Sequence, residues 1–299
     1  MFVLDHINSI PVGACRAIGA FASRDISEPL LLRQDLVEAI VDLDIPDSDT
    51  AQRLSVTLLP GVAPFIVLQY RTSTESYREY GGTGRMHAPY RHVAAKLHSG
   101  IVTVKSPGPL GLVIARLRPD MAARLLGNRM AAFMDAKIAL GDLIHPNAVD
   151  LLQDMVSEAR SSAERIEIMM RFLGTHTRDE SPDALVSHVA KRLRSNPLTR
   201  IRQLADEAGV SERHLSRRFR LAFGTSPKHF ARMARFESLL AARASERSWA
   251  GLACASGFAD QAHMIHDFRD IVGAPPERVL TAVRAPVPDP SGPRPILMW

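Results

Sequence analysis

The chain has 299 residues, a formal net charge of +5 and only two cysteines. Its length suits two domains with separate hydrophobic cores. The isolated Cys15 and Cys254 exclude a disulfide framework, favour a reducing compartment and are expected to be buried thiols. No run reaches the roughly 18 apolar residues of a membrane-spanning helix. The start, residues 1–6, lacks the basic and apolar segments of a signal peptide, so we expect a cytoplasmic protein without a membrane partner.

Charge is distributed unevenly along the chain. Residues 181–299 carry 18 Lys and Arg against 11 Asp and Glu, whereas residues 1–180 carry 19 against 21. A basic C-terminal part behind a nearly neutral N-terminal part places the contact with a polyanion in the C-terminal part.

The first 120 residues show the pattern of short strands. Residues 53–70 predict two strands interrupted by Pro60 and Gly61, and residues 92–104 and 110–118 are rich in Val and Ile. After Pro119 the apolar residues follow a helical period. The predicted helices are residues 120–127, 129–139, 146–160 and 162–173. Strands followed by helices predict a small β-barrel with a helical hairpin.

Part of this region resembles a known sensory domain. The resemblance is carried by residues 108–119 (Gly-Pro-Leu-Gly-Leu-Val-Ile-Ala-Arg-Leu-Arg-Pro), Ala123-x-Leu125-Leu126-Gly127 and Ala139-Leu140-x-Asp142-Leu143. They look like a cupin-like sensory domain. The resemblance implies a barrel that binds a small effector and helices that dimerise. Residues 174–182 are polar, contain Gly and Pro, and suit an exposed linker.

Tyrosine and arginine are concentrated between residues 70 and 91, where all four tyrosines of the chain fall. This combination suits an aromatic or anionic effector, and an ordinary solvated hairpin is the alternative. The candidate effector-binding residues are Tyr70, Arg71, Arg85, His87 and Tyr90. No metal site or cofactor is expected, because His87, His92 and His98 lack the His-x-His spacing of metal-binding cupins and no catalytic motif occurs.

A pattern that occurs twice, about fifty residues apart, dominates the C-terminal part. The first copy is Ile201-x2-Leu204-Ala205-x3-Gly209-Val210, then Leu215, Phe219, Gly224 and Pro227. The second is Trp249-x2-Leu252-Ala253-x3-Gly257-Phe258, then Met264, Phe268, Gly273 and Pro276. Each predicts a helix, a turn at the glycine, an N-cap at Ser211 or Asp260, and a second helix. The repeat, joined by a long helix over about residues 227–244, indicates one helix-turn-helix unit used twice.

The outer faces of the two second helices carry the candidate base-reading residues. In the first copy Arg213, Ser216 and Arg217 oppose the apolar face, which suits a helix in a major groove. The second copy has Ala262, Ile265 and His266 there, so we expect the first copy to carry most of the sequence information. The candidate DNA-contacting residues are Arg213, Ser216, Arg217, Arg220, Arg202, Lys228, Gln261, Ala262, Ile265, His266 and Arg269. Arg202, Arg220, Lys228 and Arg269 are assigned to phosphates.

The stretch from about Ser187 to Leu280 resembles the DNA-binding domain of AraC/XylS-type transcription regulators. The resemblance is carried by Leu204-Ala205-x3-Gly209-Val210-Ser211, Leu215, Phe219-Arg220, Gly224-x-Ser226-Pro227, Arg235, Leu239-Leu240, Ala253-x3-Gly257-Phe258-x-Asp260, His263, Phe268-Arg269 and Gly273-x-x-Pro276. It implies a seven-helix domain whose recognition helices enter successive major grooves roughly 34 Å apart. The family often has an aromatic residue where Met264 stands and a more polar one at Ile265.

These patterns predict an α+β chain of two domains. Residues 1–173 form a cupin-like sensing and dimerisation domain with a helical hairpin, and residues 183–280 form an all-α domain with two helix-turn-helix units joined by a long helix. The tail, residues 281–299, contains five prolines and is expected to be disordered.

The predicted function is a sequence-specific, effector-responsive DNA-binding transcription regulator without enzymatic activity. Its expected partners are double-stranded DNA, RNA polymerase, a small-molecule effector and a second copy of the chain. One alternative is a DNA-targeted enzyme such as an alkyl-transfer repair protein, for which Cys15 is the candidate reactive thiol outside the DNA-binding domain. The other is an effector-independent regulator whose N-terminal domain only dimerises.

Overall fold

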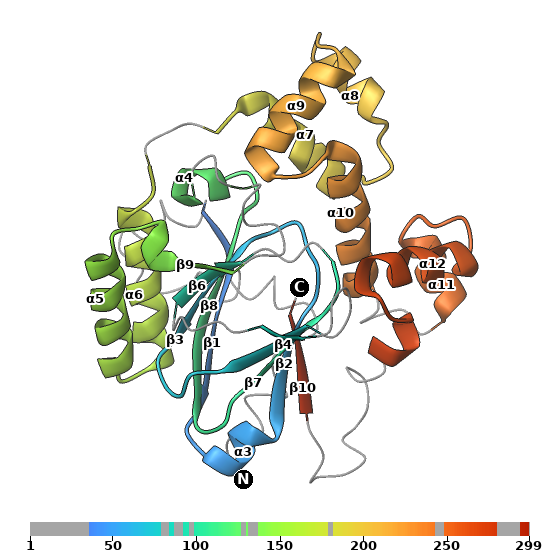
Figure 1. The fold of residues 1–299 in the computed structure, drawn as a ribbon. Helices are drawn as coiled ribbons and strands as arrows, with labels where there is room; N and C mark the ends of the chain where they lie inside the picture. The colour runs from blue at the N-terminus through green and yellow to red at the C-terminus, as the bar shows by residue number, and fades with distance from the viewer. Residues whose placement is uncertain are drawn as a thin grey trace.

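The computed structural model describes residues 36–78, 84–86, 92–95, 99–126, 130, 137–178, 182–242, 248–279 and 294–298 (Figure 1). For residues 84–86, 92–95, 137 and 294–298 it describes the backbone alone. A sheet-rich N-terminal part carries two helices along one side, and a helical C-terminal part lies at its other end and flank (Figure 1). The predicted α+β architecture of two parts is confirmed.

The described strands form two five-stranded sheets that do not close into one barrel. The first sheet has the order β1 (Val37–Ile45), β8 (Leu110–Leu117), β3 (Phe65–Gln69), β6 (His92–Ala95) and β9 (Lys137–Ala139), and its neighbours are antiparallel. The second has the order β10 (Arg294–Met298), β2 (Leu54–Leu58), β7 (Val102–Lys105), β4 (Glu75–Arg78) and β5 (Gly84–Met86).

Alternate side chains along the strands pack between the two sheets. Leu43 of β1, Val56 of β2 and Ile114 of β8 belong to one buried cluster, as the alternation of side chains along a strand requires. The opposite face of the first sheet packs on helices. Those helices are α4 (Ala122–Leu126), α5 (Pro146–Glu158) and α6 (Ser162–Thr175). Covered on both faces, β8 is buried along its whole length.

Most predicted elements of this part are present. The two strands around Pro60, the strand over 110–118 and the hairpin α5–α6 are confirmed. The helix predicted over 129–139 is wrong at 137–139, because that backbone pairs with β6 as β9. Met130 apart, the rest of that stretch lies outside the described residues. Two short helices, α3 (Ser48–Gln52) and η3 (Leu140–Asp142), complete the described elements of this part.

The C-terminal part is helical throughout its described residues. Its helices are α7 (Ala184–Ser195), α8 (Ile201–Glu207), α9 (Glu212–Phe223), α10 (Pro227–Ala242), α11 (Trp249–Ala255) and α12 (Gln261–Val272), and residues 276–279 are also helical. Five phenylalanines are fully buried in its core: Phe219, Phe223, Phe230, Phe236 and Phe268. The long helix expected between the two units is α10.

The C-terminal tail departs from the expectation of disorder. Residues 294–298 form β10, which pairs in parallel with β2. Without it β2 would be an edge strand with unpaired backbone groups, and Pro295 is tolerated because β10 itself lies at the edge. Residues 280–293 and Trp299 lie outside the described residues.

Neither cysteine confirms the expectation of buried thiols. Cys254 is exposed, because on α11 the neighbouring Leu252 and Ala253 face the core, and Cys15 lies outside the described residues. No helix in the described part of the chain is long and apolar enough to cross a membrane.

Candidate nucleic-acid interface

Both units turn from their first helix to their second with the same hydrogen bonds. In the first unit Val210 N donates to Ala205 O at 3.0 Å, and in the second Phe258 N donates to Ala253 O at 2.9 Å. Gly209 and Gly257 adopt φ values of 65° and 71°, the left-handed conformation in which glycine carries no steric penalty. Each α8–α9 or α11–α12 pair therefore contains a Schellman turn.

The predicted N-caps are confirmed in both units. Ser211 Oγ accepts from His214 N at 3.2 Å, and Asp260 Oδ1 accepts from His263 N at 2.7 Å. Each satisfies one backbone N–H that the first turn of the recognition helix leaves without a helical partner. The extra turn residue of the second unit therefore moves the cap, which still satisfies the backbone N–H three residues further along.

Corresponding apolar residues anchor the two recognition helices. Helix α9 buries Leu215 and Phe219, and α12 buries Met264 and Phe268 at the matching positions. Met264 is fully buried, so its unbranched side chain fills a core position. The scaffold of the two units is thus equivalent even though their outer faces differ.

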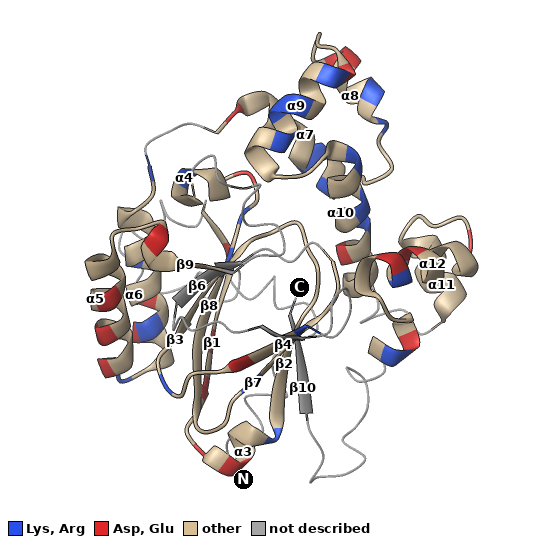
Figure 2. Ribbon diagram, in the orientation of Figure 1, with Lys and Arg blue, Asp and Glu red and all other residues tan. Residues whose placement is uncertain are grey.

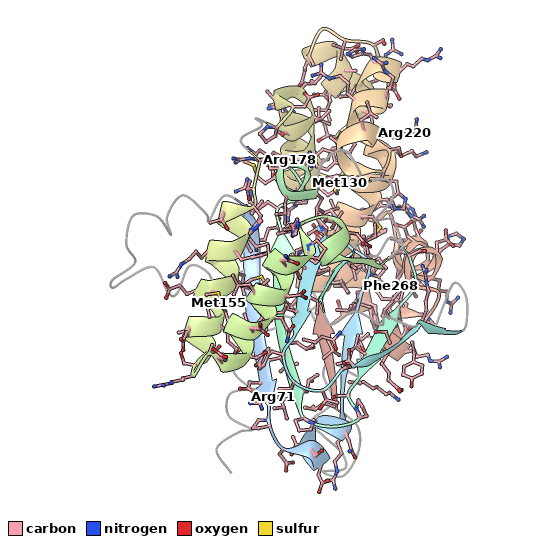
Figure 3. All side chains as sticks on the ribbon, turned by 60° about the vertical axis from the view of Figure 1, so that its left-hand side comes forward. Arg71, Met130, Met155, Arg178, Arg220 and Phe268 are labelled. Carbon is pink, nitrogen blue, oxygen red and sulfur yellow. The ribbon has the colours of Figure 1, made fainter. Side chains whose placement is uncertain are left out.

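The outer face of α9 is strongly basic. Arg213, Arg217 and Arg220 are exposed, and among the described residues none forms an ion pair or hydrogen bond with their guanidinium groups. Arg220 lies on α9, at the opposite end of the molecule from Arg71 (Figure 3). Ser216 is half-buried beside this face. Arg218 serves a different purpose, because its Nη2 pairs with the Asp183 carboxylate at 2.6 Å and ties α9 to the start of α7.

Leu221 was not among the sequence-based candidates, although it follows Arg217 by four residues. Its side chain is 62% exposed on the same helix as the basic residues. Residues four apart lie on one face of a helix, so this spacing was the signal that could have found it.

The outer face of α12 is polar but weakly charged. Gln261, Ala262 and His266 are exposed, and Ile265 is half-buried against the core. His266 Nδ1 lies 3.6 Å from Asp270 Oδ2, a carboxylate that also pairs with Arg232. The expected contrast between the two recognition faces is therefore present as a difference in exposed charge.

A cleft of about 780 Å³ lies between the two units. It is lined by Pro197, Thr199, Arg200, Ile201, Arg202, Glu212, Ser226, Lys228, His229, Ala231, Arg232, Arg235, Asp267 and Asp270. Arg232 and Arg235 are engaged with Asp267 at 2.5 and 2.9 Å. Arg200, Arg202 and Lys228 are exposed at this cleft. Figure 2 shows Lys and Arg along α7 to α10, whereas acidic residues gather on α5 and α6.

Two of the five candidate effector residues lie together, in a partly buried ion network outside the inter-sheet core. Tyr70 Oη donates to Asp42 Oδ1 at 2.8 Å, and Arg71 Nε pairs with Asp44 at 2.6 Å. Arg165 of α6 pairs with both carboxylates at 2.9 Å and lies 4.8 Å from the Tyr70 ring. Burial and the hydrogen bond to Asp42 raise the pKa of Tyr70 above its ordinary value.

The other three candidate effector residues are not placed. Arg85 is described by its backbone alone, and His87 and Tyr90 lie outside the described residues. Sequence reasoning missed Asp42, Asp44 and Arg165. For the two aspartates the available signal was their Asp-x-Asp spacing, which places both side chains on one face of a strand. No group of three or more His, Cys, Asp and Glu side chains that could hold a metal ion occurs among the residues described.

Residues 204–282 match a family described as a helix-turn-helix domain, which is of the AraC type. This match spans both units and confirms the family expected for the C-terminal domain. The comparison with curated protein sequences returned no match.

Three solved structures of ToxT from Vibrio cholerae are similar to the chain at low identity. Apo ToxT K231A from strain SCE256 has a TM-score of 0.46 and 12% identity, covering 81% of this chain and 96% of that one. ToxT from O395 has a TM-score of 0.46 and 11% identity, with coverages of 83% and 98%. Unsaturated fatty acid bound wild-type ToxT from strain SCE256 has a TM-score of 0.44 and 11% identity, with coverages of 86% and 97%.

Proposed function

We propose that this DNA-binding transcription regulator, which carries an AraC-type helix-turn-helix domain, reads the two halves of its operator unequally. The observation that carries the proposal is the contrast between the recognition helices. Helix α9 presents Arg213 and Arg217 to solvent, whereas α12 presents Ala262 and His266 at the corresponding positions. Arginine forms paired hydrogen bonds with guanine in the major groove, and alanine offers at most a contact with a thymine methyl group.

Phosphate contacts would fix the register of the two units on DNA. Arg202 and Lys228 are exposed at the cleft between the units, and Arg220 and Arg269 are exposed on the two recognition helices. A DNA backbone that crosses this cleft would also meet Arg200, which is exposed there. Because each neutralised phosphate releases counterions, affinity should fall steeply as salt rises, on random and specific DNA alike.

The N-terminal domain is proposed to bind a small effector and to dimerise. The apolar core between its two sheets is the proposed place of the effector. The exposed Leu151 and Met155 on α5 support dimerisation. RNA polymerase is the proposed further partner, and the cytoplasm the proposed location. We propose no catalytic role for the chain; Cys15, the reactive thiol of the enzyme alternative, lies outside the described residues.

Replacing Arg217 by alanine is expected to weaken binding to the specific site by about 1–3 kcal/mol and to relax base preference at one position. The reason is that Arg217 is exposed on the outer face of the recognition helix α9, from which side chains reach base edges in the major groove. Fluorescence anisotropy with specific and random duplexes would measure both affinities. Arg220→Ala is the matched control, since loss of a phosphate contact should affect both duplexes similarly. An equal loss on both duplexes for Arg217→Ala would make Arg217 a phosphate contact only.

A further inference from the structure

Three apolar residues of the N-terminal domain belong to the core of the DNA-binding domain. Leu59, Val62 and Ile101 are buried in the cluster that contains Ile271 of α12 and Phe236 of α10. They come from the end of β2, the loop after it and the segment before β7. The two domains therefore share apolar packing. Hydrogen bonds from Gly100 N to Ile271 O and from Val62 N to Glu237 Oε1 place these segments beside α12 and the long helix α10, which Figure 1 shows running toward the sheets.

An alternating chain of charges reinforces this contact. Arg116 of β8, whose side chain is only 6% exposed, places Nη2 2.7 Å from Glu237 Oε1 of α10 and Nε 3.2 Å from Glu38 Oε2 of β1. Glu38 also pairs with Arg194 of α7, and Glu237 Oε1 accepts from Val62 N at 2.9 Å. Glu38 and Arg116, in the middle of this chain of charges, belong to the N-terminal domain, whereas Arg194 and Glu237, at its ends, belong to the DNA-binding domain.

A β-bulge accounts for the position of Glu38. Val37 pairs with Leu117 and Ala39 with Arg116, so Glu38 is an extra residue in β1. A bulge changes the direction of a side chain at the end of a strand, and here it brings the Glu38 carboxylate to Arg116. Arg116 is therefore held by a carboxylate of its own domain while it binds Glu237 of the other.

The N-terminal domain also caps the second recognition helix. Gly100 N donates to Ile271 O in the last turn of α12 at 2.8 Å. The last carbonyl groups of a helix have no partner within the helix, so this bond satisfies a group that α12 cannot satisfy itself. Beside the first unit, the charged contacts of the N-terminal domain go to α7: Glu38 pairs with Arg194, and Asp120 lies 3.8 Å from the mostly exposed Lys191 Nζ.

We infer that the N-terminal domain positions the second recognition helix, α12, and that Arg116 is the positioning residue through its pair with Glu237. This inference rests on the proposed function, because it names how reading by α12 is regulated. A change in the N-terminal domain that moves β1 and β8 alters the placement of α12, while the placement of α9 stays the same. Such a change would tune the second half of the operator without altering the first.

Hydrogen exchange of the free protein tests the positioning without DNA. In Arg116→Met and, more mildly, Glu237→Gln, amides of the last turns of α12 should exchange faster than in the wild type, while those of α9 remain unchanged. Arg192→Met is the matched control, because Arg192 lies on α7 but pairs with Glu207 inside the first unit. Equal acceleration in α9 and α12, or none in α12 for either variant, would overturn the inference.

Half-site substitutions in the operator test the consequence for reading. In Arg116→Met the loss of affinity caused by mutating the half under α12 should shrink, on the order of fivefold, while the loss for the other half is retained. In the double variant Arg116→Met/Glu237→Gln the same effect should shrink no further than in the more damaging single variant, since both substitutions remove the same Arg116–Glu237 pair. Equal shrinkage in both halves would contradict positioning of α12. If the wild type selects no DNA while α12 still loosens selectively, the proposed function fails and the positioning stands.

Discussion

Alanine at Phe219 is expected to lower the free energy of unfolding of the C-terminal domain by about 3–5 kcal/mol. Phe219 has no exposed surface, and its ring centroid lies 4.5 Å from that of Phe223 and 5.2 Å from that of Phe230. Truncation removes these contacts and leaves a cavity between α9 and α10. Because domains of this size are stable by only about 5–15 kcal/mol, urea unfolding followed by circular dichroism would show the change clearly.

Leu221→Ala is the control on the same helix. Leu221 is largely exposed, so its truncation should change stability by no more than about 0.5 kcal/mol. Comparable losses at Phe219 and Leu221 would mean that α9 does not pack as described. Because Leu221 shares the face of Arg217, the same variant also reports whether that position contacts DNA.

Methionine at Arg165 is expected to destabilise the N-terminal domain by about 3–5 kcal/mol. Arg165 pairs with Asp42, whose side chain is only 1% exposed, and with Asp44. Without the guanidinium the Asp42 carboxylate remains buried without its cation, and the contact between α6 and β1 loses its charged link. Thermal or urea unfolding of the full chain, with a probe in each domain, would measure the loss.

Two further variants separate the loss of a buried charge pair from the loss of any arginine on α6. Arg171→Met removes an exposed pair with Glu167 on the same helix and should cost less than about 1 kcal/mol. Asp42→Asn in the Arg165→Met background should recover part of the stability, because it removes the uncompensated charge. No recovery would indicate that Arg165 stabilises α6 by packing alone.

The helix-turn-helix units could be predicted from sequence because their signals are local. The caps at Ser211 and Asp260, the glycines that end the first helices, and the anchors Phe219 and Phe268 all act within one unit. The repeat supplied a second, independent instance of each signal. For the same reason the difference in charge between the recognition faces was visible before the fold.

The contacts between distant segments could not be predicted in this way. Glu38, Arg116 and Glu237 lie far apart in the chain, and nothing near any of them indicates its partners. The tail strand β10 was missed because its prolines argue against regular structure, while its pairing depends on the free edge of β2. Tyr70 and Arg71 stand out in the sequence, but their partners Asp42 and Asp44 lie 28 and 27 residues earlier in the chain, on β1.

Unequal reading of the two operator halves is tested most directly in two steps. A bound fragment is first selected from genomic DNA, and the affinity of the protein is then measured for variants of it in which each base pair is substituted in turn. Arg213→Ala/Arg217→Ala and Gln261→Ala/His266→Ala would identify the half under each helix. We expect substitutions under α9 to cost about 1–3 kcal/mol each, and those under α12 to cost less. Equal costs in the two halves, or larger costs under α12, would contradict the account.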